Sequence, residues 1–141
     1  MKTFLLEIVT PERVVFSEQV EMIVAEGAEG QLGVLANHVP LVTPLKIAPL
    51  KIRKNGKASY LAVNGGFLEV RKNKAVVLAE SAEWPEEIDV ERAMAAKARA
   101  EQRLKSGRRD EFDYRRAELA LQRALNRLQV ARMRGENQGE P

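Results

Sequence analysis

The sequence predicts an α+β protein, with an antiparallel β-sandwich or flattened barrel followed by an antiparallel hairpin of two helices. Over the first 80 residues, short apolar runs alternate with polar residues and are broken by Gly, Pro and Asn, which is typical of strands. About nine short strands with no helix between them indicate a sandwich. From residue 90 onward, Ala, Leu, Arg and Glu dominate at spacings of three and four, which indicates helices.

The change of pattern occurs at residues 81–93, S-A-E-W-P-E-E-I-D-V-E-R-A, and we call this stretch the joint. Pro85 cannot donate to a strand ladder, and Asp89 offers an acceptor to the free amides of a new helix. The joint therefore predicts a domain boundary, with a sandwich at residues 1–86, a hairpin at 87–134 and a disordered tail at 135–141.

The expected strands are separated by recognisable turns. Asn55-Gly56 predicts a tight hairpin, and residues 64–66, Asn-Gly-Gly, predict a second turn. The Gly- and Pro-rich residues 27–46 predict a bent surface loop around a short strand. Pro49 favours an edge or a bulge. The expected strands are residues 3–9, 14–16, 20–25, 45–52, 58–63, 67–70 and 75–79.

Two helices of similar length follow the joint. The first is expected over residues 90–105, ending at Ser106-Gly107, and the second begins with Asp110 as cap and Asp113 as the capping-box carboxylate. Because its seam is rich in alanine, the hairpin buries little apolar area and is expected to be a movable element. The expected buried stripes are Ala93, Ala96, Ala100 and Leu104, and then Tyr114, Ala117, Leu121, Ala124, Leu125 and Leu128.

Composition excludes several kinds of site. The 45% of hydrophobic and 30% of charged residues predict a folded protein. The absence of cysteine excludes disulfides and thiolate metal sites, and a single histidine excludes a multi-histidine site. No apolar stretch is long enough to span a membrane. The net charge of +3 is uneven: residues 1–86 hold ten Lys or Arg and ten Glu, whereas residues 87–134 hold thirteen basic and eight acidic residues. The helical part therefore predicts an acidic partner.

Three stretches resemble one family. They are G-x-x-G-x-L-G-V-L-x-x-H-x-P-L at residues 27–41, L-A-V-x-G-G-F-L-E-V at 61–70, and R-A-E-L-A-L-x-R-A-x-N-R-L at 116–128 together with I-D-V-E-R-A at 88–93. Over nearly its whole length the chain resembles the epsilon subunit of bacterial F-type ATP synthase. The resemblance implies a sandwich of about ten strands and a non-catalytic rotor subunit.

The resemblance also implies partners. The sandwich is expected to sit on the gamma subunit and the ring of c subunits, on the cytoplasmic side of the cell membrane. The hairpin is expected either to fold against the sandwich or to extend along gamma toward the beta and alpha subunits. In the extended form it is expected to block rotation in the direction of ATP hydrolysis.

Residues 88–93 resemble the motif by which some members of the family bind ATP. Asp89 offers acceptors for an adenine or a ribose, and Arg92 a planar guanidinium. Arg123 and Arg127 share a helix face, which suits a triphosphate. The full expected ATP site is Glu83, Ile88, Asp89, Arg92, Ala93, Arg123 and Arg127. Whether Mg²⁺ accompanies ATP is left open, and no metal site of the protein's own is expected. In the alternative interpretation, Asp89 is only a helix cap and the arginines only solvated.

Residues 27–38 resemble the family's contact with the c-ring, and the expected contact residues are Glu29, Gly30, Gln31, Leu32, Gly33 and His38. The alternative interpretation is a structural turn-rich loop. Two other functions compete with the rotor subunit. A basic hairpin suits nucleic acid but lacks interleaved aromatic residues, and a free-standing ATP sensor leaves the 27–41 loop without a role. An enzyme is not expected, because no nucleophile–base pair or phosphate loop accompanies the motif.

Overall fold

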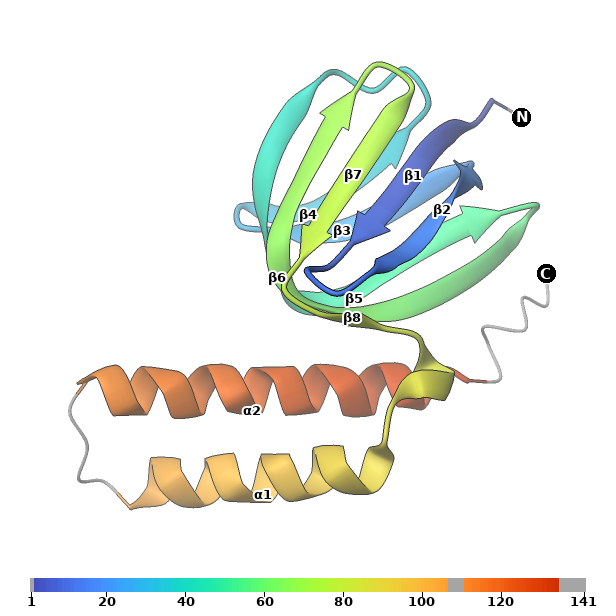
Figure 1. Ribbon diagram of the computed structural model, residues 1–141. Helices are drawn as coiled ribbons and strands as arrows, with labels where there is room; N and C mark the ends of the chain where they lie inside the picture. The colour runs from blue at the N-terminus through green and yellow to red at the C-terminus, as the bar shows by residue number, and fades with distance from the viewer. Residues whose placement is uncertain (1, 107–110, 135–141) are drawn as a thin grey trace.

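The computed structural model describes residues 2–106 and 111–134. Its N-terminal part is a sandwich formed by one coiled sheet, with strand order β2-β1-β7-β6-β5-β3-β4 and β8 paired beside β6 (Figure 1). All strand pairs are antiparallel except β1 with β7, which are parallel. The strands are β1 (Phe4–Val9), β2 (Val14–Val20), β3 (Met22–Gly27), β4 (Gly30–Leu35), β5 (Leu41–Lys54), β6 (Lys57–Arg71), β7 (Lys74–Ala79) and β8 (Ala82–Glu83).

Alternate residues of these strands point inward and form one apolar core. β1 and β7 show the expected period of two, with every second side chain buried. Because the core lies between the two layers of the sheet, side chains of strands far apart in sequence meet there. Its largest fully buried side chains include Leu6, Ile8, Ile23, Leu50, Ile52, Leu61 and Leu68.

Two expectations about the strands are wrong. Residues 64–66 are not a turn, because β6 runs through them and bends, with Gly65 and Gly66 at φ values of 88° and 136°. Residues 27–46 contain the expected short strand, β4, but their last part is not a loop, because β5 begins at Leu41. Continuous β5 and β6 also reduce the described strands to eight.

Other turn expectations are confirmed. Asn55 and Gly56 both take positive φ, and Lys54 pairs with Lys57 across them. The irregularity expected near Pro49 is present, because the β3–β5 register shifts between Val24–Lys51 and Gly27–Leu45.

The chain leaves the sandwich through the joint, where the 3₁₀-helix η1 (Pro85–Glu87) precedes α1 (Val90–Lys105). Asp89 is the N-cap of α1, as expected, and its Oδ1 accepts from the amide of Arg92 at 3.1 Å. The second helix, α2 (Glu111–Ala131), returns along α1. The caps expected at Gly107 and Asp110, with the capping box that Asp113 would complete, and the tail at 135–141 lie outside the described residues.

The helices are stacked on one end of the sandwich: α2 lies against β5 and β6, and α1 packs on α2 (Figure 1). The expected alanines Ala93, Ala100, Ala117 and Ala124 are buried in the hairpin. The sequence predicts Tyr114 and Leu125 in the buried stripe, but they are 48% and 44% exposed. The reason is that α2 is covered only on the sides that face α1 and the sandwich. Within the described part of the chain, no helix is long and apolar enough to cross a membrane.

A candidate nucleotide site at the joint

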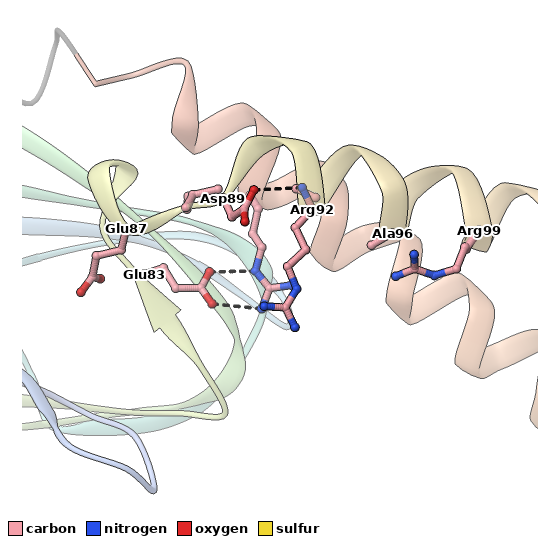
Figure 2. Close-up of a pocket in the computed structure, with 9 residues that line it drawn as sticks. Glu83, Glu87, Asp89, Arg92, Ala96 and Arg99 are labelled. Atoms are coloured by element: carbon pink, nitrogen blue, oxygen red, sulfur yellow. Dashed lines mark hydrogen bonds and ion pairs between the residues drawn. The ribbon is translucent and has the colours of Figure 1, made fainter.

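A cavity of about 470 Å³ opens where the joint, α1 and α2 meet (Figure 2). β8 contributes Glu83 and α2 contributes Arg127, while the remaining walls come from the joint and the first turns of α1. Because its walls come from both the sandwich and the hairpin, the cavity requires the arrangement in which α2 packs on the sandwich, here called the docked state. The lining residues are Glu83, Glu87, Ile88, Asp89, Arg92, Ala93, Ala96, Arg99 and Arg127.

The shape of the joint is set by local hydrogen bonds. The Glu87 carboxylate accepts from the Trp84 amide at 2.9 Å and from Arg13 Nη2, also at 2.9 Å. Trp84 packs on Phe16 with ring centroids 5.9 Å apart, so the start of the joint is anchored to the sandwich. These contacts hold Asp89 at the mouth of the cavity, where it begins α1.

Glu83 and Arg127 form a bidentate ion pair across the cavity. Arg127 Nε lies 2.8 Å from Glu83 Oε1, and Nη2 lies 3.0 Å from Oε2 (Figure 2). Both side chains are partly buried, at 30% and 26% exposure. The pair joins α2 directly to β8, and Arg127 also lines the cavity.

Two other cations of the cavity have no anionic partner in the part of the chain that the structure describes. The guanidinium groups of Arg92 and Arg99 come from one face of α1, and among residues 2–106 and 111–134 neither forms an ion pair. Of the three carboxylates that line the cavity, Glu83 is paired with Arg127 and Glu87 with Arg13, while Asp89 accepts from a backbone amide of α1. The cavity can therefore accept an anionic ligand without displacing an ion pair of Arg92 or Arg99.

The structure brings together six of the seven residues expected in the ATP site: Glu83, Ile88, Asp89, Arg92, Ala93 and Arg127 line the cavity. Arg123, half-buried one turn earlier on α2, does not line it. Sequence reasoning missed Glu87, Ala96 and Arg99. The spacing of Arg92, Ala96 and Arg99 by four and three residues puts them on one helix face, and this signal was present in the sequence.

The residues expected at the c-ring lie in two places. Glu29 to Gly33 form the tip of the β3–β4 hairpin and the first part of β4, and Gln31 Nε2 donates to Glu26 at 2.8 Å. His38 lies beyond the other end of β4, where its amide donates to Leu35. About 17 Å of strand separates the two ends. The expected residues therefore lie along β4 and just beyond its two ends.

The outer face of the sandwich carries a row of apolar residues across five strands, exposed except for the half-buried Val9. Phe67 of β6 pairs with Pro44 and Leu78, Leu78 pairs with Val9, and Val9 pairs with Val14. Phe67, Leu78 and Val14 are 52%, 51% and 61% exposed. We call these five residues the apolar row; contiguous exposed apolar surface of this kind marks interaction sites.

The charges beside the apolar row are paired with one another. Glu69 binds Arg71 Nε at 3.1 Å, and Glu7 lies 3.3 Å from Lys74 Nζ. The hydrogen bond from Arg71 lowers the pKa of Glu69, and the same bond raises the pKa of Arg71. Since both carboxylates have a basic neighbour, the face presents little unpaired negative charge.

Comparison with known proteins agrees with this architecture. Residues 3–85 match the family model described as ATP synthase, Delta/Epsilon chain, beta-sandwich domain, and residues 86–132 match its long alpha-helix domain. An ATP synthase epsilon chain of Desulforamulus reducens is 55% identical, covering 92% of this chain and 98% of the relative. One of Bacillus velezensis is 52% identical, covering 93% and 98%.

Solved structures show the same fold. A chain of the Euglena gracilis mitochondrial ATP synthase, in a structure of OSCP, F1 and the c-ring, superimposes with a TM-score of 0.77 at 27% identity, covering 92% of this chain and 81% of that one. A chain of the Tetrahymena thermophila central stalk and c-ring superimposes with a TM-score of 0.64 at 16% identity, covering 92% and 97%, and shows the fold alone. Both domain models together with relatives above 50% identity show that the chain belongs to the epsilon chains of the ATP synthase delta/epsilon family.

Proposed function

We propose that this epsilon chain is a non-catalytic subunit of the ATP synthase central stalk whose hairpin restrains ATP hydrolysis, and that ATP bound in the joint cavity keeps the hairpin docked. The observation that carries the ATP assignment is that Arg92 and Arg99, which form no ion pair with any described residue, line a cavity shared by sandwich and hairpin.

The chemistry of the cavity suits each part of a nucleotide. Arg92 and Arg99 are placed to bind phosphate oxygens, and Arg127 joins them if its bond to Glu83 is exchanged. Ile88, Ala93 and Ala96 provide an apolar wall for the base, and Asp89 Oδ atoms accept from ribose or amino groups. In this proposal Mg²⁺ arrives, if at all, with the nucleotide.

Regulation follows from where the cavity lies. A ligand that contacts β8, the joint, α1 and α2 together binds only the docked state, and it therefore shifts the hairpin toward that state in proportion to its concentration. High ATP then favours the docked hairpin and permits rotation, whereas low ATP releases the hairpin to inhibit hydrolysis.

The partners are proposed from the surfaces and the family. The apolar row fits a complementary apolar face on gamma, and the tip at residues 29–33 is the proposed c-ring contact. The basic hairpin would meet acidic surfaces of beta and alpha when it extends. In this arrangement the subunit is peripheral, on the cytoplasmic side of the membrane. No observation favours the nucleic-acid-binding alternative.

Calorimetric titration of the isolated chain with ATP tests whether ATP binds in the joint cavity and so could keep the hairpin docked. An Arg92→Ala, Arg99→Ala double variant is expected to weaken binding about a hundredfold, because two charge-assisted contacts are lost. A Lys97→Ala, Arg132→Ala variant removes the same charge from the opposite side of the hairpin and should bind like the native chain. Repeating the titration with a chelator measures any need for Mg²⁺. Absence of saturable binding by the native chain at millimolar ATP would exclude the proposal that ATP keeps the hairpin docked.

A further inference from the structure

A buried pair of amide side chains connects α2 to the sandwich, apart from the joint cavity. Asn126 of α2 and Asn64 of β6 are 4% and 1% exposed. Asn126 Nδ2 donates to Asn64 Oδ1 at 3.1 Å and to the Val63 carbonyl at 3.2 Å. Asn64 in turn donates through Nδ2 to Ser81 Oγ at 2.9 Å. Both donated bonds of Asn126 are therefore made to acceptors of the sandwich.

Polar contacts at one side of this interface are the Glu83–Arg127 pair and the hydrogen bonds from Arg134 to the carbonyls of Pro85 and Ile88. The remaining contacts between α2 and the sandwich are apolar and few. Ala62 and Ile88 pack with Val130 and Ala131 of α2, with Val90 beside them. Apolar contact is non-directional and holds α2 on the sandwich in many positions, whereas the amide hydrogen bonds have strict geometry. If α2 slid by one turn, so that Val130 took the place of Asn126, the acceptors of Val63 and Asn64 would lose their donor.

We propose that the Asn64–Asn126 pair determines the register of the docked hairpin, so that α2 is either docked in one position or released. The inference rests on the proposed movement of the hairpin but not on ATP binding. A single buried asparagine plays a comparable role in helical coiled coils, where it selects one register at a cost in stability. The Oδ1 atom of Asn126 has no partner among the described residues, so the Nδ2 donors alone carry the selection.

The test is an isosteric substitution, Asn126→Asp, which replaces both donors with a carboxylate facing two acceptors. The described surroundings from β5, Ile47 to Pro49, are uncharged. The nearby charged groups are Arg123 and Arg127 of α2 and Glu83 of β8, of which the last two are paired. Gln129→Glu, an exposed position on the same helix, is the matched control for the added charge.

The chain lacks cysteine, so spin labels can be attached at Lys57→Cys and Tyr114→Cys, both exposed, and their distance measured by pulsed electron resonance. The native chain and Gln129→Glu are expected to give one narrow distance. At about pH 8, Asn126→Asp is expected to lower the ratio of docked to released hairpin about tenfold or more, because the carboxylate is buried without a donor.

Acidification distinguishes a variant whose hairpin is released from the sandwich from a variant that fails to fold. The docked state raises the pKa of the introduced carboxyl group, so docking is lost as pH rises through that raised value. It is fully regained only below the ordinary Asp pKa of about 3.9, where the protonated group donates again. Recovery of the native distance supports the register role, and permanent loss overturns it. A native distance for Asn126→Asp at pH 8 also overturns it, even if the native chain binds ATP. The native chain could fail to bind ATP while the hairpin of Asn126→Asp is released at pH 8 and docks again on acidification. In that case the proposed role of ATP fails, but the proposed role of the Asn64–Asn126 pair stands.

Discussion

Asp89 shows at the residue scale how one side chain serves two purposes. Its carboxylate caps α1 and also lines the cavity. Asp89→Asn keeps a good cap and should leave the thermal unfolding of the protein nearly unchanged, whereas Asp89→Ala should cost about 1 kcal/mol. Calorimetry with ATP then isolates the second role, because both variants should bind ATP more weakly. If Asp89→Asn bound like the native chain, the side chain would be only a cap.

Gly66 is required by the bend of β6. A Cβ atom there would lie 2.0 Å from the Leu78 carbonyl oxygen, at a φ of 136°. Gly66→Ala is therefore expected to lower the free energy of unfolding of the sandwich by at least about 2 kcal/mol. Gly33→Ala, where nothing lies within 4 Å, is the control and should change it little in chemical denaturation.

Glu69 provides a residue-scale test by pH. The Arg71 hydrogen bond lowers its pKa, so any stabilisation from the pair exists above the unfolded carboxyl pKa and is lost as pH falls through the lowered folded value. NMR titration should find the Glu69 pKa below its ordinary range, and higher in Arg71→Ala. An unchanged value in the variant would refute the assignment. Because the pair is exposed, the unfolding free energy should hardly respond.

At the scale of elements, α2 is attached to β8 by the Glu83–Arg127 pair. Glu83→Gln and Arg127→Gln, singly and together, form a double-mutant cycle on unfolding of the hairpin, followed by far-ultraviolet circular dichroism. The partly buried bidentate geometry predicts a coupling energy of about 1 kcal/mol, falling with added salt. Additive effects of the two substitutions would show that the pair does not hold the hairpin.

Elements that depend on contacts between neighbours in the sequence could be predicted from it. Elements that depend on pairing with distant strands could not. The Asn55-Gly56 hairpin and the Asp89 cap follow from residues that interact with their own neighbours. Gly65 and Gly66 carry the same local turn signal, yet β6 continues because β5 and β7 pair on either side of it. Cross-strand pairing between residues distant in sequence overrode the local preference.

At the scale of the whole molecule, the apolar row predicts assembly. Phe67→Asp with Leu78→Lys places opposite charges on a cross-strand pair of half-exposed residues, so thermal unfolding should change little, but co-purification with the gamma subunit should fall at least tenfold. A Lys57→Asp, Lys105→Asp variant, charged at exposed positions away from the row, is the control. Normal co-purification of the first variant would exclude this face as the gamma contact.

Only part of the candidate site could be predicted from the sequence. The motif at residues 88–93 and the Arg127 position identified most of the lining, and the helical spacing of Arg92, Ala96 and Arg99 was available to extend it. Arg123 shares a helix face with Arg127 but does not line the cavity, because the rotation of α2 is set by the surfaces that it packs against.

The two-part architecture, the joint, the cap of α1 and the family could all be predicted from the sequence, because each depends on residues close together in the chain or on a continuous motif. Only the tertiary structure decided that α2 lies between α1 and the sandwich, that Glu83 meets Arg127, and that Asn126 meets Asn64 across 62 positions. Those contacts depend on how two surfaces fit, and their free energy comes from burial and hydrogen-bond geometry that no local pattern records.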